Sequence, residues 1–505
     1  MRTILFIIMM YFGFLMPSHS AILIAVKVSS FEEFENHIGK MAGPSMGPSW
    51  RAWWELQMTA SLGHAWTALD RTKPLYAVWV TAMTQQPSLW NKPDRIVFVP
   101  SIDPSSMLSS VSPPLLGKKM PGGICAFSES QKALADAETL LQEIQRDIPS
   151  RSGTGLFAKI HVEHIWNEYR QMIYLLKGMA FFTLSFSEVP ALQRQFNQFL
   201  EGLLWVIDSL SVVIFHASLQ TEENNQTFSF RFTFKEGSPF LSVIPGPSPS
   251  SQQLFLAEKP FSSIAGVLNP MRMSLFLRQY IDRMFQLYAI TSEEARLLRT
   301  STARIFGGKD TLPSSTLFFK SAASISELGD VQATIAISRE KRRISLAEFK
   351  DRMKRLFYNT PFRCEAVVSA DSIKTVRMRI IPKQNQASAG WPFLMVQAVR
   401  IFLKKEPEIH FTFQEEAGAI VGCLGDNIRP IIATQDLISP PASDSFLRFQ
   451  MNYPYFLEVI QSLKEGKELS DKSAVRTEKE ANLIVIFSKI DKGFKMDISL
   501  PDSGG

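Results

Sequence analysis

The sequence predicts an α+β protein with mainly antiparallel sheets and with amphipathic helices packed on one face of those sheets. Two patterns in the 505 residues predict this class. Strands that alternate apolar with polar residues are joined in pairs by short turns, and helices carry one apolar stripe each. The order in which these units recur along the chain adds a third expectation, two related halves.

The clearest strand covers residues 227–235, where four phenylalanines alternate with polar side chains in the order TFSFRFTFK. Such alternation is typical of an antiparallel strand with one face on the core and the other in water. We therefore expect Phe230 and Phe232 to be buried and Arg231 to be exposed.

Pairs of strand-like runs recur along the chain, and only a few residues separate the two members of each pair. Connections this short favour antiparallel pairing, because a parallel crossover needs roughly a dozen residues or more. We therefore expect hairpins from residues 211–220 with 227–235, 316–325 with 331–338, 362–369 with 375–382, and 482–490 with 494–501.

Helix-like segments lie between these pairs, and each has apolar residues three or four positions apart. Stripes of this kind pack on a sheet, and the apolar strand faces offer the largest surfaces for them. Ser345 and Glu348 have the spacing of a capping box, which marks the start of the last helix. The expected stripes are Leu134, Ala137, Leu141 and Ile144; Ile165, Tyr169, Met172 and Leu176; Leu277, Ile281, Met284 and Tyr288; and Leu346, Phe349, Met353 and Leu356.

A segment rich in proline, glycine and serine, VIPGPSPSSQQ at residues 243–253, is typical of a linker. It predicts an N-terminal α+β domain at residues 21–245 and a C-terminal α+β domain at residues 255–500. Residues 155–176 and 261–282 both read as strand, turn and helix, and a hairpin follows each. We interpret the second domain as a diverged duplicate of the first; the alternative is that strand–helix units recur in any α+β protein.

Residues 1–20 have the layout of a secretory signal peptide. One arginine is the only charge, residues 4–16 are almost entirely apolar, and small residues stand one and three positions before the cleavage site. The pattern predicts cleavage between Ser20 and Ala21 and a periplasmic or extracellular protein. Retention as an uncleaved anchor is the alternative, because residues 21–26 are also apolar.

Composition argues against nucleic-acid binding and against a membrane-spanning protein. The net charge is +6, and the basic residues are scattered apart from REKRR at residues 339–343, whereas nucleic-acid-binding proteins gather basic charge on one face. Acidic residues interrupt the apolar segment 196–217, and Lys177 interrupts the segment 172–186. We expect no nucleic-acid partner and, after signal cleavage, no integral membrane protein; the partner is an envelope protein or a ligand.

The three cysteines are Cys125, Cys364 and Cys423, and the sequence contains no C-x-x-C motif. An odd count this small does not make a disulfide scaffold. Each cysteine lies in an apolar strand-like run, so we interpret them as buried free thiols. Whether two of them pair stays open.

Residues 95–110, RIVFVPSIDPSSMLSS, combine a strand, a polar turn and a helix start, and residues 255–285 repeat this texture. In this order of elements the chain resembles a family of exported bacterial proteins that are built from repeated strand–helix–hairpin units. The function of that domain family is unknown. The resemblance implies an envelope or secreted location and no established activity. It therefore assigns no functional residues.

A formal match to the G-x-S-x-G nucleophile elbow of serine hydrolases lies at residues 43–47, with Ser45 as the nucleophile. That elbow needs a strand before the serine and a helix directly after it. Here a helix-like segment precedes the motif, and two prolines stiffen the loop before the next helix. We interpret the motif as a helix–helix connection.

His161 and His164 are the only closely spaced histidines, and they lie where a strand turns into a helix. Zinc sites use histidine pairs together with further ligands, and no third ligand is evident near these two. GTGLFA at residues 153–158 fits G-x-G-x-x-A, but it opens a strand rather than a helix, so we reject a dinucleotide site.

No complete catalytic constellation, cofactor motif or metal motif can be assembled from these residues. The sequence therefore favours a non-enzymatic exported protein that binds a partner or an amphiphilic ligand. Tryptophans between residues 50 and 90 mark the first region to search for a ligand groove, although their helical spacing is typical of a core. The alternative is a secreted hydrolase or metal-dependent enzyme that uses Ser45 or the pair of His161 and His164.

Overall fold

The structure of the protein is a computed structural model. It describes residues 21–33, 35, 52, 55–57, 59, 64–81, 93–111, 113–148, 155–185, 190–219, 226–244, 262–287, 290–306, 317–325, 331–339, 345–357, 362–368, 375–382, 409–416, 419–424, 445–452 and 482–500. The predicted signal peptide and the predicted linker core lie outside these residues.

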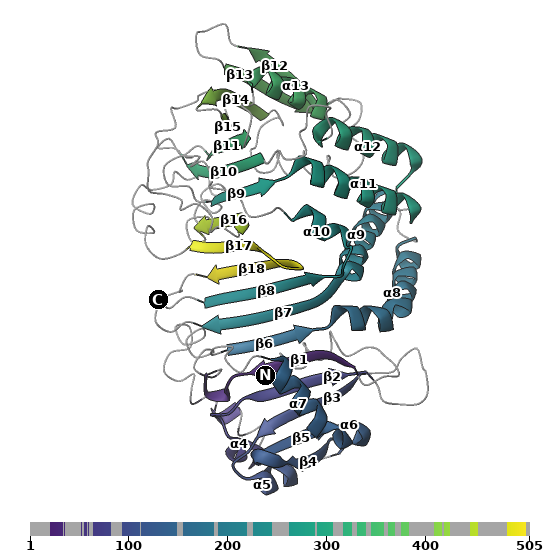
Figure 1. The fold of residues 1–505 in the computed structure, drawn as a ribbon, viewed down its shortest axis with the longest axis vertical. Coiled ribbons are helices and arrows are strands. Elements are labelled where there is room, and N and C mark those ends of the chain that lie inside the picture. Colours follow the sequence, from purple (N-terminus) through teal and green to yellow (C-terminus); the bar gives the residue numbers. More distant parts are fainter. Residues whose placement is uncertain are drawn as a thin grey trace. The chain divides into compact units, whose positions relative to one another are not determined.

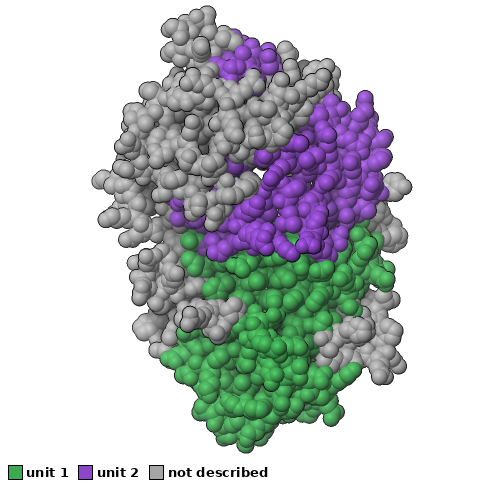
Figure 2. Space-filling view, viewed as in Figure 1, with its two compact units in different colours: residues 1–179, 210–234, 499–505 green, residues 180–209, 235–498 purple. Residues whose placement is uncertain are grey.

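The chain divides into two compact units, coloured separately in Figure 2. Unit 1 contains residues 1–179, 210–234 and 499–505, and unit 2 contains residues 180–209 and 235–498. Both units combine helices with antiparallel strands, so the predicted α+β class is confirmed. The predicted domain boundary between residues 245 and 255 falls on undescribed residues and stays a prediction.

Unit 1 contains an antiparallel sheet in the order β4-β5-β3-β2-β1-β6-β7-β8 (Figure 1). The first described strand, β1, lies inside this sheet, because it pairs with β2 on one side and with β6 on the other. The bounds are β1 Ile22–Val28, β2 Leu75–Val80, β3 Asp94–Pro100, β4 Leu116–Met120, β5 Ile124–Ser128, β6 Gly155–Ile160, β7 Leu210–Leu219 and β8 Gln226–Phe234.

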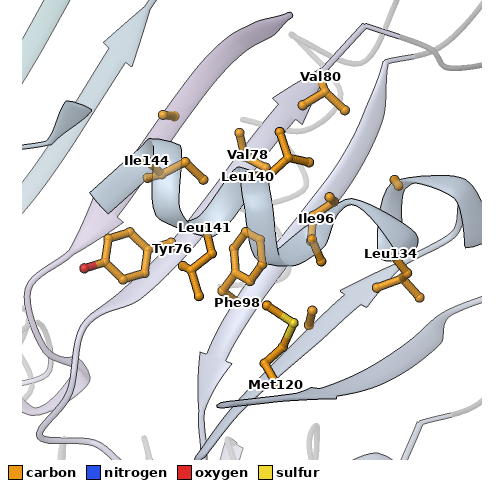
Figure 3. Close-up of a cluster of buried hydrophobic side chains, with 14 of the residues drawn as sticks. Tyr76, Val78, Val80, Ile96, Phe98, Met120, Leu134, Leu140, Leu141 and Ile144 are labelled. Carbon is orange, nitrogen blue, oxygen red and sulfur yellow. The ribbon is translucent and has the colours of Figure 1, made fainter. Parts of the chain in front are cut away.

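Helices cover both faces of the β3–β5 region, whereas the sequence predicted one covered face. On one face α6 (Gln131–Ala135) and α7 (Ala137–Asp147) pack on a core that includes Ile96 and Phe98 (Figure 3). On the other face α4 (His64–Ala68) and α5 (Pro104–Ser109) enclose a second core with Trp66, Met107, Cys125 and Phe127. The sequence did not reveal this second layer, because α4 and α5 span only one or two turns and carry no repeating stripe.

The long helix α8 (Val162–Ser185) begins directly after β6. Tyr169 and Met172 of its predicted stripe are buried, and Tyr169 packs with Leu23 and Trp79. Leu176, predicted on the same stripe, is 43% exposed. Among the α8 side chains that the structure describes, up to residue 179, none after Met172 is buried.

Unit 2 contains an antiparallel sheet in the order β12-β13-β14-β15-β11-β10-β9-β16-β17. A two-residue turn joins β17 to β18. The bounds are β9 Ser262–Leu268, β10 Leu317–Ile325, β11 Val331–Arg339, β12 Phe362–Val368, β13 Thr375–Pro382, β14 Ile409–Glu416, β15 Ala419–Leu424, β16 Ser445–Asn452, β17 Asn482–Ile490 and β18 Gly493–Leu500.

The helices of unit 2 are α9 (Pro190–Ser209), α10 (Pro239–Val243), α11 (Pro270–Gln286), α12 (Ser292–Phe306) and α13 (Leu346–Phe357). Trp205 joins three of them, because its ring lies 4.8 Å from Phe240, 5.2 Å from Phe276 and 5.5 Å from Tyr280, between ring centroids. The predicted stripe of α13 packs on β13 and β14, where Phe349 lies 4.8 Å from Phe413.

The predicted hairpins β7–β8, β10–β11 and β12–β13 are confirmed by their pairing. In β8 the period is as predicted: Arg231 is exposed, and Phe234 is only 3% exposed. Phe230 and Phe232, however, are half-buried rather than buried. Their rings stack along the strand, and Phe230 also contacts Phe215 at 4.8 Å, so part of their shielding comes from neighbouring rings on the same sheet.

No helix among the described residues combines the length and the apolar character that crossing a membrane requires.

Candidate functional site

The structure leaves the serine motif undecided, because residues 36–51, which include Ser45, lie outside the described part of the chain. Among the predicted aromatic cluster, Trp66 and Trp79 are buried at 2% and 5% exposure. The Trp66 indole donates to Glu55 at 2.7 Å, and the Arg71 guanidinium lies 4.0 Å from the Trp66 ring centroid. These two tryptophans are core residues rather than the wall of a groove.

His161 and His164 come together at the start of α8. Their rings stack with centroids 5.2 Å apart and an interplanar angle of 12°. The His161 Nε2 atom lies 3.8 Å from Oδ2 of Asp147, and the same oxygen accepts a 2.7 Å hydrogen bond from Lys159. His164 Nδ1 lies 3.4 Å from the carbonyl oxygen of Ile22.

The surroundings of His161 keep its imidazole neutral. Burial, reinforced by the nearby positive charges of Lys159 and His164, lowers the pKa of His161 to about 4, and the Asp147 carboxylate opposes this only in part. A neutral imidazole can bind a metal ion, but a stable site needs further ligands. Among the described residues, no group of three or more His, Cys, Asp and Glu side chains is placed to hold a metal ion.

Two of the three cysteines can be placed. Cys125 is buried, Cys364 is half-buried, and both are free thiols. Burial raises the pKa of both thiols, which keeps them protonated and poorly nucleophilic. The interpretation as a buried free thiol is confirmed for Cys125, whereas Cys364 is a free thiol that is only half-buried.

A cleft that the sequence did not predict lies between α11 and α12. It has a volume of about 530 Å³ and is lined by Arg278, Asp282, Arg299, Thr300 and Ala303. Asn269 fixes the start of α11, because its side chain accepts the backbone N–H of Arg272 at 3.0 Å.

The charges in this cleft are unevenly matched. Arg299 donates twice to Oδ1 of Asp282, at 3.0 Å from Nε and at 2.7 Å from Nη2. Arg278 is exposed and makes no hydrogen bond or ion pair with any described residue. Among the described residues that line the cleft, two guanidinium groups therefore face one carboxylate.

Apolar residues lie on the same face of α11 as Arg278 and Asp282, the two α11 residues that line the cleft. Met271, Leu275, Arg278, Asp282 and Phe285 follow one another at spacings of four, three, four and three residues, which places them on one helix face. Met271, Leu275 and Phe285 are 42%, 47% and 40% exposed. The face thus combines exposed apolar side chains with a cation, Arg278, for which the described residues offer no ionic partner.

Sequence reasoning recognised only a different face of α11, on which Ile281 and Met284 are buried. The spacing of the exposed stripe was readable in principle. The missing information was the position of α12, which brings Arg299, Thr300 and Ala303 alongside and turns a helix face into a cleft.

No protein-family model matches the chain, and neither a curated protein nor a solved structure matches it.

Proposed function

We propose that the protein is an exported, non-enzymatic binding protein and that its ligand is amphiphilic. The observation that carries this proposal is the α11–α12 cleft, where Arg278 has no ionic partner among the described residues and shares its helix face with exposed apolar side chains. Its volume falls in the range of roughly 300–1,000 Å³ that small-molecule sites occupy. An amphiphile matches both halves of this surface, because it offers a polar end and an apolar chain.

Native mass spectrometry of the protein recovered from the exported fraction of its producing cells tests this function. We expect the mature chain to carry one small-molecule adduct, which organic solvent removes and added decanoate displaces. A bare chain that also fails to take up decanoate would refute the proposal.

The predicted export gains support from β1. Residues 22–28 form a strand inside the sheet of unit 1, and Leu23 and Ala25 are 2% and 1% exposed. An uncleaved anchor that continued through residues 21–26 would need these same residues in an apolar helix. The strand therefore favours cleavage before Ala21 over retention.

N-terminal sequencing of the protein from its native compartment checks this cleavage. We expect the first residue to be Ala21, because the small residues before it and the strand after it separate the signal from the folded chain. An intact Met1 on protein from the soluble cytoplasmic fraction would contradict export.

We also propose that the chain contains an internal duplication, as the recurring order of its strand, helix and hairpin units predicts. Two segments share element order and pairing: β6, α8, α9, β7, β8 and β9, α11, α12, β10, β11. In each segment the first strand pairs with the second, and the second with the third, always antiparallel. Shared topology of this kind supports a common origin for the two segments.

The alternative function is a secreted hydrolase or metal-dependent enzyme. His161 is a weak base, because its pKa is lowered to about 4. General bases work best with pKa values near the operating pH. This mismatch argues against His161 as a general base.

A further inference from the structure

We propose that the α11–α12 cleft binds an anionic amphiphile, a single acyl chain that ends in a carboxylate or phosphate, with its headgroup on Arg278. This inference rests on the proposed function and assigns its ligand chemistry and its site. It follows from three features: the Arg278 guanidinium, which has no ionic partner in the part of the chain that the structure describes, the position of Asp282, and the apolar residues on the same face of α11.

The headgroup is assigned by charge. A guanidinium offers several N–H donors in a planar fork that fits both oxygens of a carboxylate or phosphate. Arg299 is already bound to Asp282, whereas Arg278 has no ionic partner among the described residues. Thr300 does not compete for the anion, because its hydroxyl donates to the Arg296 carbonyl at 2.8 Å.

The position of Asp282 assigns the direction in which the ligand's acyl chain extends from the headgroup. Toward the C-terminal end of α11, a bound anion would meet the Asp282 carboxylate, one turn beyond Arg278. Arg299 also lies toward that end, and its guanidinium is 5.8 Å from the Phe285 ring centroid. This guanidinium is already paired with the Asp282 carboxylate. An acyl chain laid in that direction would cover the Asp282–Arg299 ion pair and remove it from water, which costs free energy, so the acyl chain extends the other way.

The acyl chain of the ligand contacts Leu275 and Met271, which lie roughly one and two turns before Arg278 on the same face. Both side chains are exposed although they are large and apolar, at 47% and 42%. A bound acyl chain would shield them from water. Each fully buried methylene of the ligand then tightens binding by up to about fourfold.

Isothermal titration of the full mature chain with decanoate, decyl phosphate and neutral decanol tests the assignment. We expect one site, with both anions binding at least tenfold more tightly than decanol, and the tighter of the two anions identifies the headgroup. Arg278→Gln should lower the affinity for both anions at least tenfold. Leu275→Ser should weaken decanoate severalfold but leave acetate, which has no chain, unchanged.

Two further variants control the test. Arg231→Gln removes an exposed arginine in unit 1 and should bind decanoate as the wild type does. Ala303→Trp fills the cleft and should abolish binding while circular dichroism still shows a folded chain. This second variant tests the site independently of charge.

The possible failures are distinguishable. If wild type binds decanoate but Arg278→Gln and Ala303→Trp bind it equally well, the cleft assignment is wrong and the proposed function stands. Equal affinity for decanol and decanoate would overturn the anionic headgroup. If wild type binds none of the amphiphiles, the proposed function and this inference fall together.

Discussion

Ile144→Ala should lower the free energy of unfolding by about 2–5 kcal/mol, the usual cost of truncating a buried aliphatic side chain. Ile144 is 0% exposed and lies on α7 above the sheet of unit 1 (Figure 3). It packs in one cluster with Val78, Ile96 and Phe98, so its loss leaves a cavity that close-packed neighbours fill only in part. Urea unfolding followed by tryptophan fluorescence measures the effect.

The neighbouring residue provides the matched control. Gln145 is exposed on the same helix, so Gln145→Ala should change the free energy of unfolding by no more than about 0.5 kcal/mol. Equal effects of the two substitutions would mean that α7 does not pack on this sheet.

Lowering the pH from 7 to 4 should cost the wild-type protein about 3 kcal/mol more stability than it costs His161→Gln. The pKa of His161 is lowered from 6.5 to about 4 in the folded chain. Above pH 6.5 the imidazole is neutral in both states. Below pH 6.5 the unfolded chain binds a proton at this histidine and the folded chain does not. The free energy of unfolding therefore falls by about 1.4 kcal/mol per pH unit, until the folded His161 is also protonated near pH 4.

The difference between the two pH profiles is the quantity to measure, because carboxyl groups titrate in both proteins. His164→Gln serves as the control, since His164 is exposed and its removal should keep most of the extra slope. If wild type and His161→Gln lose stability in parallel between pH 6.5 and 4, His161 is not buried as the structure shows.

Local patterns made much of the fold predictable. The hairpins β7–β8 and β10–β11 follow from alternation and short turns, and the α13 stripe follows from its spacing. The segment predicted as one helix with Leu134 and Ile144 on its stripe is two helices that meet at Asp136, although both residues reach the same core. A stripe reports which side chains turn inward and does not report a break in the backbone between them.

Long-range pairing could not be predicted. β1 pairs with β6 more than a hundred residues away, and β9 pairs with β16 at a comparable separation. Strand partners this distant share no turn that would fix their register. The cleft was missed for a related reason: Arg278 and Thr300 belong to different helices, and only the packing of α12 on α11 brings them together.

The claim that this protein binds rather than hydrolyses is tested most directly by labelling with a fluorophosphonate probe, which reacts with activated serines. Ser45 is the one serine in a G-x-S-x-G match, and the sequence before it predicts a helix rather than the strand that an elbow requires. We expect wild type and Ser45→Ala to remain equally unlabelled. Labelling of wild type at Ser45 that disappears in Ser45→Ala would contradict the account and establish a hydrolase.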